Sequence, residues 1–290
     1  IMSLKIEHLS YTYMKGTPFE KKALNDINFE IEDGEFVGII GHTGCGKSTL
    51  VQHFNGLLKP EEGNIYIHGK LVNHSNLKEL RKQVGLVFQY PEYQLFESTV
   101  YKDIAFGIKS EALTPEEEYK RVLEAAQKTG LQEELLEKSI YDLSGGQKRR
   151  AAIAGIIVMN PKILVLDEPA AGLDPAGRDD ILYFAKRLRD ENGITVILVS
   201  HSMEDIAKLA DKVIVLNEGK LEMTPREVFR NEERLNQIGL TVPQMTSVFH
   251  QLGKILPESG IQKEIFTVEE GAEEILRLLK NSDRRRGNAI

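Results

Sequence analysis

The sequence predicts an α/β fold in which a mostly parallel sheet carries helices and a small antiparallel β layer. Short, continuous apolar runs are typical of parallel strands that are buried on both faces. Segments that alternate apolar and polar residues are typical of half-buried antiparallel strands. The continuous runs are Phe36–Ile40, Val84–Phe88, Ile163–Leu166, Thr195–Val199 and Val213–Leu216, and the alternating segments are Leu4–Tyr13, Ala23–Glu32 and Asn64–His68.

Helical patterns fill the long stretch between the second and third of the continuous runs. One pattern covers residues 99–137, and another runs from Lys148 to Met159. Within the first, Thr114 before Pro115 is a typical helix start. We therefore expect a helical subdomain at about residues 98–160.

Composition and charge are those of a soluble globular protein. The chain has 290 residues, of which 41% are hydrophobic and 28% are charged, and its net charge is −7. This negative charge argues against an extended nucleic-acid surface, so we expect no nucleic-acid partner. The one cysteine, Cys45, excludes an intrachain disulfide and suits a reducing compartment. No apolar run is long enough to span a membrane, and the start, which we place at Met2, has no signal-peptide core.

A glycine-rich segment lies between the run Phe36–Ile40 and a predicted helix. Its pattern, Gly-x-x-x-x-Gly-Lys-Ser, is that of a P-loop, whose backbone N–H groups wrap a phosphate at a helix N-terminus. We expect Lys47 to reach the β- and γ-phosphates and Ser48 to hold Mg²⁺. A chance lysine in a glycine-rich turn would lack the flanking strand and helix. The segment comprises Gly41, His42, Thr43, Gly44, Cys45, Gly46, Lys47, Ser48 and Thr49.

Two adjacent acids, Asp167 and Glu168, close the apolar run that ends at Leu166. Ligands of open α/β sheets bind at the carboxyl ends of the strands, so these acids should face a bound nucleotide. We expect Asp167 to orient Mg²⁺ through water and Glu168 to polarise the attacking water. The alternative is a pair of surface acids in a turn, and the preceding apolar run argues against it.

A second glycine-rich segment precedes the helix predicted from Lys148. A glycine-rich helix N-terminus with a serine hydroxyl can bind an anion. An ordinary N-cap with glycines explains the segment equally well, and both interpretations stay open. The segment comprises Leu143, Ser144, Gly145, Gly146 and Gln147.

The order of these motifs, over roughly Leu4 to Lys220, resembles the nucleotide-binding subunits of ABC transporters. That pattern also has a glutamine after a strand, here Gln89, and a histidine after a later strand, here His201. The resemblance implies that Tyr13 stacks on adenine, with strand packing as its alternative role. It also implies that Asp174 lies in the loop that crosses between paired subunits, and that His201 contacts the γ-phosphate.

Three segments more specifically resemble the ATPases of energy-coupling factor (ECF) transporters. Of that family's two ATPase types, the chain resembles the second. The three segments are the P-loop with Gln52–Asn55, Phe88–Glu97 and Glu168–Pro175. The resemblance implies a heterodimer with a non-identical sister ATPase, an integral membrane coupling subunit and a substrate-binding membrane subunit. It implies a peripheral protein on the cytoplasmic face of the cell membrane that powers uptake of vitamins or transition-metal ions.

The expected reaction is hydrolysis of ATP by a P-loop NTPase core of the ABC type. Lys47 and the loop N–H groups would stabilise charge on the transferring phosphoryl group. Ser48, Gln89 and Asp167 would hold Mg²⁺, while Glu168 acts as the base. Gln89 would also link the site to the membrane partner. By resemblance, each ATP lies between one subunit's P-loop and the other subunit's Leu-Ser-Gly-Gly-Gln segment.

The chain should divide into a nucleotide-binding domain at residues 2–224, a C-terminal extension at 225–280, and a disordered tail at 281–290. The segment after Thr224 resembles the C-terminal extension of the ECF ATPases, and this resemblance implies that it contributes to dimerisation. Short helices are expected at Pro225–Phe229 and Val242–Leu256. An apolar stripe at helical spacing follows, and we expect at least part of it to pack on the chain's own core. The stripe comprises Val268, Ala272, Ile275, Leu276 and Leu279.

Three rival functions fit the sequence less well. ABC proteins that act on ribosomes carry two cassettes per chain, and this chain has one. Chromosome-structural ATPases place a long coiled coil between the P-loop and the Asp-Glu pair, where this sequence has no sustained heptads. The ATPase of a different importer is the strongest rival, and copurification with a membrane subunit would separate the two.

Two segments carry further hypotheses. Tyr90–Phe96 is rich in aromatics and should form the groove for helices of the membrane partner through Glu92 and Tyr93, with a local mini-core as the alternative.

Cys45 lies in the phosphate loop near Lys47 and a helix N-terminus, so its pKa should be depressed if water reaches it. The alternative is an inert side chain packed under the loop.

Overall fold

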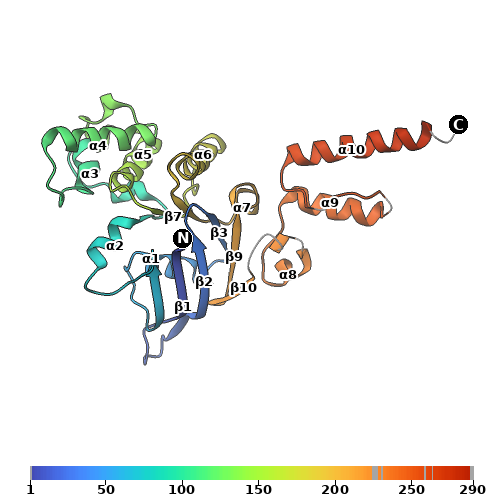
Figure 1. Ribbon diagram of the computed structural model, residues 1–290, viewed down its shortest axis with the longest axis horizontal. Helices are drawn as coiled ribbons and strands as arrows, with labels where there is room; N and C mark the ends of the chain where they lie inside the picture. Colours follow the sequence, from blue (N-terminus) through green and yellow to red (C-terminus); the bar gives the residue numbers. More distant parts are fainter. Residues whose placement is uncertain (1, 224–227, 230, 258, 263, 288–290) are drawn as a thin grey trace.

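The computed structural model describes residues 2–223, 228–229, 231–257, 259–262 and 264–287. Its centre is a six-stranded sheet in the order β10-β9-β3-β8-β7-β6, in which all strands except β10 run parallel (Figure 1). The predicted parallel sheet is thus confirmed. Its strands are β3 (Phe36–Ile40), β6 (Val84–Val87), β7 (Ile163–Asp167), β8 (Thr195–Val199), β9 (Lys212–Asn217) and β10 (Lys220–Met223).

A four-stranded antiparallel sheet forms the predicted second layer, in the order β2-β1-β4-β5. Its strands are β1 (Met2–Tyr13), β2 (Lys21–Glu32), β4 (Glu62–Ile67) and β5 (Lys70–Leu71). The register of β1 and β2 brings Tyr13 opposite Lys21. This pairing places the end of β1 close to the start of β2, which later matters for the site.

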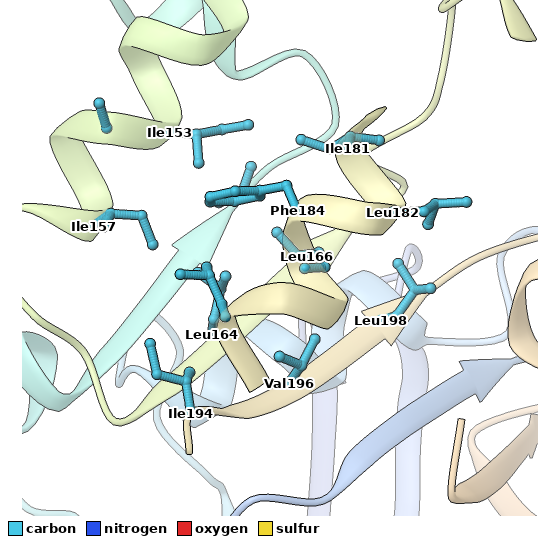
Figure 2. Packing of buried hydrophobic residues seen from close by; sticks show 14 of the residues in the cluster. Ile153, Ile157, Leu164, Leu166, Ile181, Leu182, Phe184, Ile194, Val196 and Leu198 are labelled. Atoms are coloured by element: carbon cyan, nitrogen blue, oxygen red, sulfur yellow. The ribbon is translucent and has the colours of Figure 1, made fainter. Parts of the chain in front are cut away.

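The parallel strands are buried on both faces because successive side chains enter two different cores. Leu164, Leu166 and Leu198 face one core, where they meet residues of α5 (Gly145–Ile157) and α6 (Pro175–Asn192), as Figure 2 shows. Ile163, Val165 and Ile197 face the other core, together with the antiparallel sheet and α1 (Lys47–Phe54). This explains why these strands are apolar without alternation.

Between β6 and β7 the chain forms the predicted helical subdomain, which lies beside the sheet in Figure 1. Its longest helix before α5 begins at a complete capping box, in which Thr114 and Glu117 satisfy each other's backbone N–H groups. The helices of this region are α3 (Val100–Phe106), α4 (Pro115–Lys128) and α5, with short 3₁₀ turns η1 (Pro91–Gln94), η2 (Glu133–Leu135) and η3 (Ile140–Asp142). The remaining helices of the core are α2 (Leu77–Gln83) and α7 (Met203–Leu209).

The C-terminal region consists of α8 (Glu232–Gln237), α9 (Gln244–Ile255) and α10 (Val268–Gly287), which extend away from the sheets in Figure 1. Gly271 lets α10 approach α9 closely, because a Cβ there would lie 2.4 Å from Met245. The helix predicted over 225–229 falls mostly on residues outside the described ranges.

Two sequence expectations for this region are wrong. The apolar stripe is exposed on α10, because Gly271 and the buried Glu274, rather than the stripe, form the inward face. The tail expected to be disordered from residue 281 continues as helix to Gly287, in keeping with the high helix propensity of arginine. Residues 288–290 lie outside the described ranges.

We expect Phe184→Ala to lower the free energy of unfolding by about 3–5 kcal/mol, since the ring fills the space between α5 and the sheet (Figure 2). The neighbouring Tyr183 is the matched control, because its side chain is 67% exposed whereas Phe184 is 8% exposed. Tyr183→Ala should change stability by less than about 0.5 kcal/mol. Chemical denaturation measures both, and equal losses would contradict this view of the core.

Candidate active site

The glycine-rich loop between β3 and α1 forms a cradle whose shape requires glycine. Gly46 has φ +108°, and a Cβ at this position would lie 2.5 Å from the carbonyl oxygen of Ala23. The loop can therefore bend close to β2 only with glycine here. The Lys47 ammonium folds back into the cradle and donates to the carbonyl oxygens of Gly41 at 2.6 Å and His42 at 3.1 Å. This arrangement presents a fixed positive charge to a phosphate.

A cavity of about 520 Å³ opens in front of the loop. It brings together side chains from the end of β1, the loop, and the carboxyl ends of β6, β7 and β8, as parallel-sheet geometry predicts. Its lining residues are Tyr13, Lys21, Ala23, Thr43, Gly44, Gly46, Lys47, Ser48, Thr49, Gln89, Asp167, Glu168 and His201. Lys21 and Ala23 were missed by the sequence analysis, because their place depends on the β1–β2 register and no motif marks them.

Glu168 has the properties of a general base. Burial raises the pKa of its carboxyl group from 4.5 to about 7, partly opposed by His201 and by the Lys47 charge. A base with a pKa near the working pH is the most effective proton acceptor. Its backbone has φ +52°, a strained region for a residue with a Cβ, and its N–H donates to Val199 in β8 at 3.0 Å. The strand therefore fixes Glu168 in an unusual conformation.

Asp167 has a hydroxyl-bearing neighbour that suits a metal site. Burial raises the pKa of its carboxyl group, while the Ser48 hydroxyl and the Lys47 ammonium lower it. Mg²⁺ prefers oxygen ligands and is usually held by one or two carboxylates together with substrate phosphates and water. Among the described residues, no cluster of three or more His, Cys, Asp or Glu side chains could hold a metal ion alone. Ser48 and Asp167 therefore fit Mg²⁺ that arrives with a nucleotide.

His201 lines the cavity beside Glu168. Its Nε2 is 3.0 Å from Glu168 Oε1. Burial and the nearby Lys47 lower the pKa of the imidazole, with Asp167 acting in the opposite direction. A neutral imidazole near pH 7 can donate one hydrogen bond and accept another. His201 is thus equipped to bridge the base and a bound phosphate.

Tyr13 contacts both the strand and the cavity. Its hydroxyl lies 3.2 Å from the Thr49 hydroxyl, and its ring meets Tyr11 edge-on at 5.0 Å between centroids. The ring remains partly exposed in the cavity wall. The strand-packing role is therefore present, and stacking on adenine stays a prediction.

The Leu143–Gln147 segment does not line this cavity. Ser144 caps α5, accepting from the Gln147 N–H at 3.3 Å, and Gln147 Oε1 accepts from the Ser144 N–H at 2.9 Å. This capping box lets the helix begin at Gly145, earlier than predicted. The N-cap interpretation is confirmed, while Ser144, Gly145 and Gly146 remain exposed and free to meet another molecule. Asp174 likewise caps α6 by accepting from Gly177 at 2.8 Å.

The condition for a depressed thiol pKa at Cys45, access of water, is not met, and the alternative of a packed side chain holds. The residue is 2% exposed, and burial raises the pKa of the thiol despite the nearby Lys47. A Cβ on Gly41 would lie 2.6 Å from the sulfur, so the thiol packs beneath the loop instead of facing the cavity. The loop also includes three residues that support it from behind and do not line the cavity: Gly41, His42 and Cys45.

The segment Tyr90–Phe96 is exposed at its aromatic residues, whereas Pro91 is buried and Leu95 is half-buried against the core. Tyr93 is 84% exposed, and Tyr90 and Phe96 also face solvent. Phe96 meets Phe106 edge-on at 4.9 Å, but both rings remain open to solvent, so the pair forms no buried mini-core. Glu92 instead turns inward, with a side chain only 18% exposed. The expectation that Glu92 lines a groove for the membrane partner together with Tyr93 is therefore wrong for Glu92.

Comparisons with known proteins agree with this geometry. Residues 24–171 match the ABC transporter family. Over 283 residues the chain is 56% identical to the energy-coupling factor transporter ATP-binding protein EcfA2 of Acetivibrio thermocellus, covering 97% of this chain and 100% of the relative. This chain is a member of the ECF ATPase family. The EcfA2 protein of Caldanaerobacter subterraneus subsp. tengcongensis is 57% identical to it over 285 residues, covering 97% of this chain and 99% of that protein.

Solved structures place the same fold in the ABC family. The structure of cbiO1 from Clostridium perfringens, part of the ABC transporter complex cbiONQ, has a TM-score of 0.73 and 39% identity, covering 88% of this chain and 99% of its own. The ATP-binding cassette MJ0796, dimeric in a post-hydrolysis state with ADP and Pi, has a TM-score of 0.69 and 32% identity. The match covers 76% of this chain and 97% of the MJ0796 chain. As an ABC ATPase, this ECF ATPase is an ATP-hydrolysing transporter subunit.

We expect Glu168→Gln to bind ATP and to hydrolyse it roughly 10²–10⁴ times more slowly, because an amide cannot accept the proton of the attacking water. In the unmodified enzyme, kcat/KM should rise as pH increases through about 7, since the carboxylate is the active form. Steady-state ATPase assays and nucleotide titrations measure both. Near-normal turnover of the variant in the purified complex would contradict the role of Glu168.

Cys45 should react much more slowly with iodoacetamide in the folded protein than in guanidinium, because the thiol is buried and its pKa is raised. Mass spectrometry of labelled protein gives the two rates. Cys45→Ser controls for labelling elsewhere and should retain ATPase activity, since serine is of similar size. Rapid labelling of the folded protein that ATP prevents would instead place the sulfur next to the phosphates.

Proposed function

We propose that this ECF ATPase hydrolyses Mg-ATP at sites shared with a sister ATPase, and that the pair powers an importer of vitamins or transition-metal ions. The observation that carries this proposal is the separation of two complementary half-sites on one chain. The cavity around Lys47 has a cradle, an acid pair and a histidine, but the exposed Ser144–Gly146 segment does not line it. A second, inverted chain would bring such a segment to each cavity.

In this proposal each residue of the cavity has a defined task. Lys47 and the loop N–H groups hold the β- and γ-phosphates, and Ser48, Gln89 and Asp167 bind the oxygen shell of Mg²⁺. Glu168 takes the proton from the attacking water. His201 contacts the γ-phosphate, Tyr13 stacks on adenine and Asp174 crosses to the sister chain. When bound, Mg²⁺ would neutralise charge on the transferring phosphoryl group and on the departing ADP.

Pairing is further supported by the C-terminal helices. Ile275, Leu276 and Leu279 on α10 are exposed large apolar side chains, as are Val248 and Ile255 on α9. Contiguous exposed apolar residues commonly mark protein interfaces. We therefore assign residues 2–224 to nucleotide binding and 225–280 to dimerisation, with the sister ATPase as the occupant of this surface.

The membrane side of the proposal rests on the aromatic surface at η1. Tyr90, Tyr93 and Phe96 are exposed together, a composition that suits an amphipathic helix of an integral membrane coupling subunit. Within the described residues, no helix is both long and apolar enough to cross a bilayer. The chain would thus act as a peripheral subunit on the cytoplasmic face, and a separate substrate-binding membrane subunit would choose the cargo.

We expect the tagged chain, expressed with the other subunits of its transporter and purified from detergent extract, to carry a sister ATPase and membrane subunits. Tyr93→Ala should release the membrane subunits and keep the sister, because only the aromatic surface changes. Leu276→Ser should weaken pairing with the sister. Mass spectrometry identifies the captured chains, and light scattering measures the mass of each complex.

Tyr183→Ala, which removes an exposed ring from α6, is the control for both surfaces. It should leave the composition of the complex unchanged. Recovery of the chain alone, or with an exporter's membrane domain, would reject the proposed function. If Tyr93→Ala retains every subunit and full uptake, η1 is not the membrane contact.

A further inference from the structure

A buried arginine outside the cavity joins three segments of the ATPase. Arg149, in α5, has a side chain that is only 6% exposed. Its Nε donates to Glu92 Oε2 at 3.0 Å, and its Nη2 donates to Glu92 Oε1 at 2.9 Å. The remaining hydrogen bonds go to the carbonyl oxygens of Pro169 and Ala171 at 3.1–3.2 Å. One guanidinium group therefore links α5, η1 and the loop after β7.

Each of the two far ends of this linkage adjoins a functional element. Glu92 is the neighbour of Tyr93, which is the most exposed large side chain of η1. Pro169 and Ala171 directly follow the base Glu168, whose carbonyl oxygen accepts from the Ala171 N–H at 3.1 Å. Arg149 holds these carbonyl groups and Glu92 at the same time, so it connects η1 directly to the turn that follows Glu168.

The chemistry of the linkage makes it stiff. Two parallel N–H···O bonds between a guanidinium and a carboxylate fix both distance and orientation, and such charge-assisted bonds are stronger than neutral ones. All five N–H groups of the Arg149 guanidinium have an acceptor. Glu92 accepts two of these hydrogen bonds, and the carbonyl oxygens of Pro169 and Ala171 accept the other three. Lysine could supply the charge but not the planar fork.

We propose that Arg149 is a positioning residue that makes the rate of ATP hydrolysis depend on what binds at η1. In this arrangement the membrane subunit moves η1, Glu92 moves with it, and Arg149 carries the displacement to the turn beside Glu168. The identity of the occupant at η1 rests on the proposed function, whereas the linkage itself is a property of this chain.

The test uses Glu92→Gln and Arg149→Lys, with Asp180→Asn as the matched control. Asp180 pairs with Arg150, the next residue of α5, in an exposed ion pair at 2.9 Å. The readout is a ratio: ATP turnover of the complete membrane complex divided by that of the soluble ATPase pair. We expect both linkage variants to lower this ratio roughly tenfold, about 1.4 kcal/mol of lost coupling. Asp180→Asn should leave it unchanged.

A second measurement needs no membrane partner. Hydrogen exchange of the isolated chain with Mg-ATP should be faster at residues 168–173 in Glu92→Gln than in Asp180→Asn, because the turn loses an anchor. If the Glu92→Gln protein is too unstable to purify, Arg149→Lys gives the same comparison with the charge kept.

The outcomes separate this inference from the proposed function. If the unsubstituted chain captures no membrane subunit, the proposed function is rejected. Hydrogen exchange at residues 168–173 then tests the linkage through Arg149 by itself. Where the complex does assemble, an unchanged turnover ratio in both linkage variants overturns the inference. Equal exchange at residues 168–173 in Glu92→Gln and Asp180→Asn overturns it as well, since Arg149 would then only fill space.

Discussion

The position of β3 between β8 and β9 is the constraint on which the site depends. The P-loop begins where β3 ends, and the acids Asp167 and Glu168 and then His201 follow the ends of β7 and β8. Because parallel strands end at one edge of the sheet, the P-loop, the two acids and the histidine meet there without any long loop. Burial of the strands on both faces keeps that edge rigid, so the core that stabilises the fold also sets the geometry of catalysis.

The same burial controls the acid–base properties of the site. It raises the pKa of Glu168 and Asp167 and lowers that of His201, so removal from water acts on all three groups. Lys47 opposes the effect on the acids and adds to it on the imidazole. A single lysine, held by loop carbonyl oxygens, thus shifts the pKa of all three groups. The packing that buries these side chains therefore also sets their acid–base properties.

The sequence predicted those parts of the structure that local patterns encode. Continuous apolar runs identified the parallel strands, and the Gly-Lys-Ser and Asp-Glu motifs identified side chains that do meet in one cavity. Contacts that depend on the register or on distant packing escaped it: Lys21 reaches the cavity through strand pairing, and Glu92 turns inward to Arg149 from a segment that looks exposed. For Cys45 the sequence left the direction of the pKa shift open, because charged neighbours are visible in a sequence, whereas depth of burial is not.

The exposed face of α10 has a consequence for how the cell must make this protein. A copy without a partner displays Ile275, Leu276 and Leu279 to the surrounding solution, and unpaired apolar surface of this kind promotes aggregation. Surplus chains would be cleared by quality control instead of persisting as idle monomers. Under the proposed pairing, production in step with the sister chain would thus be favoured by these exposed side chains.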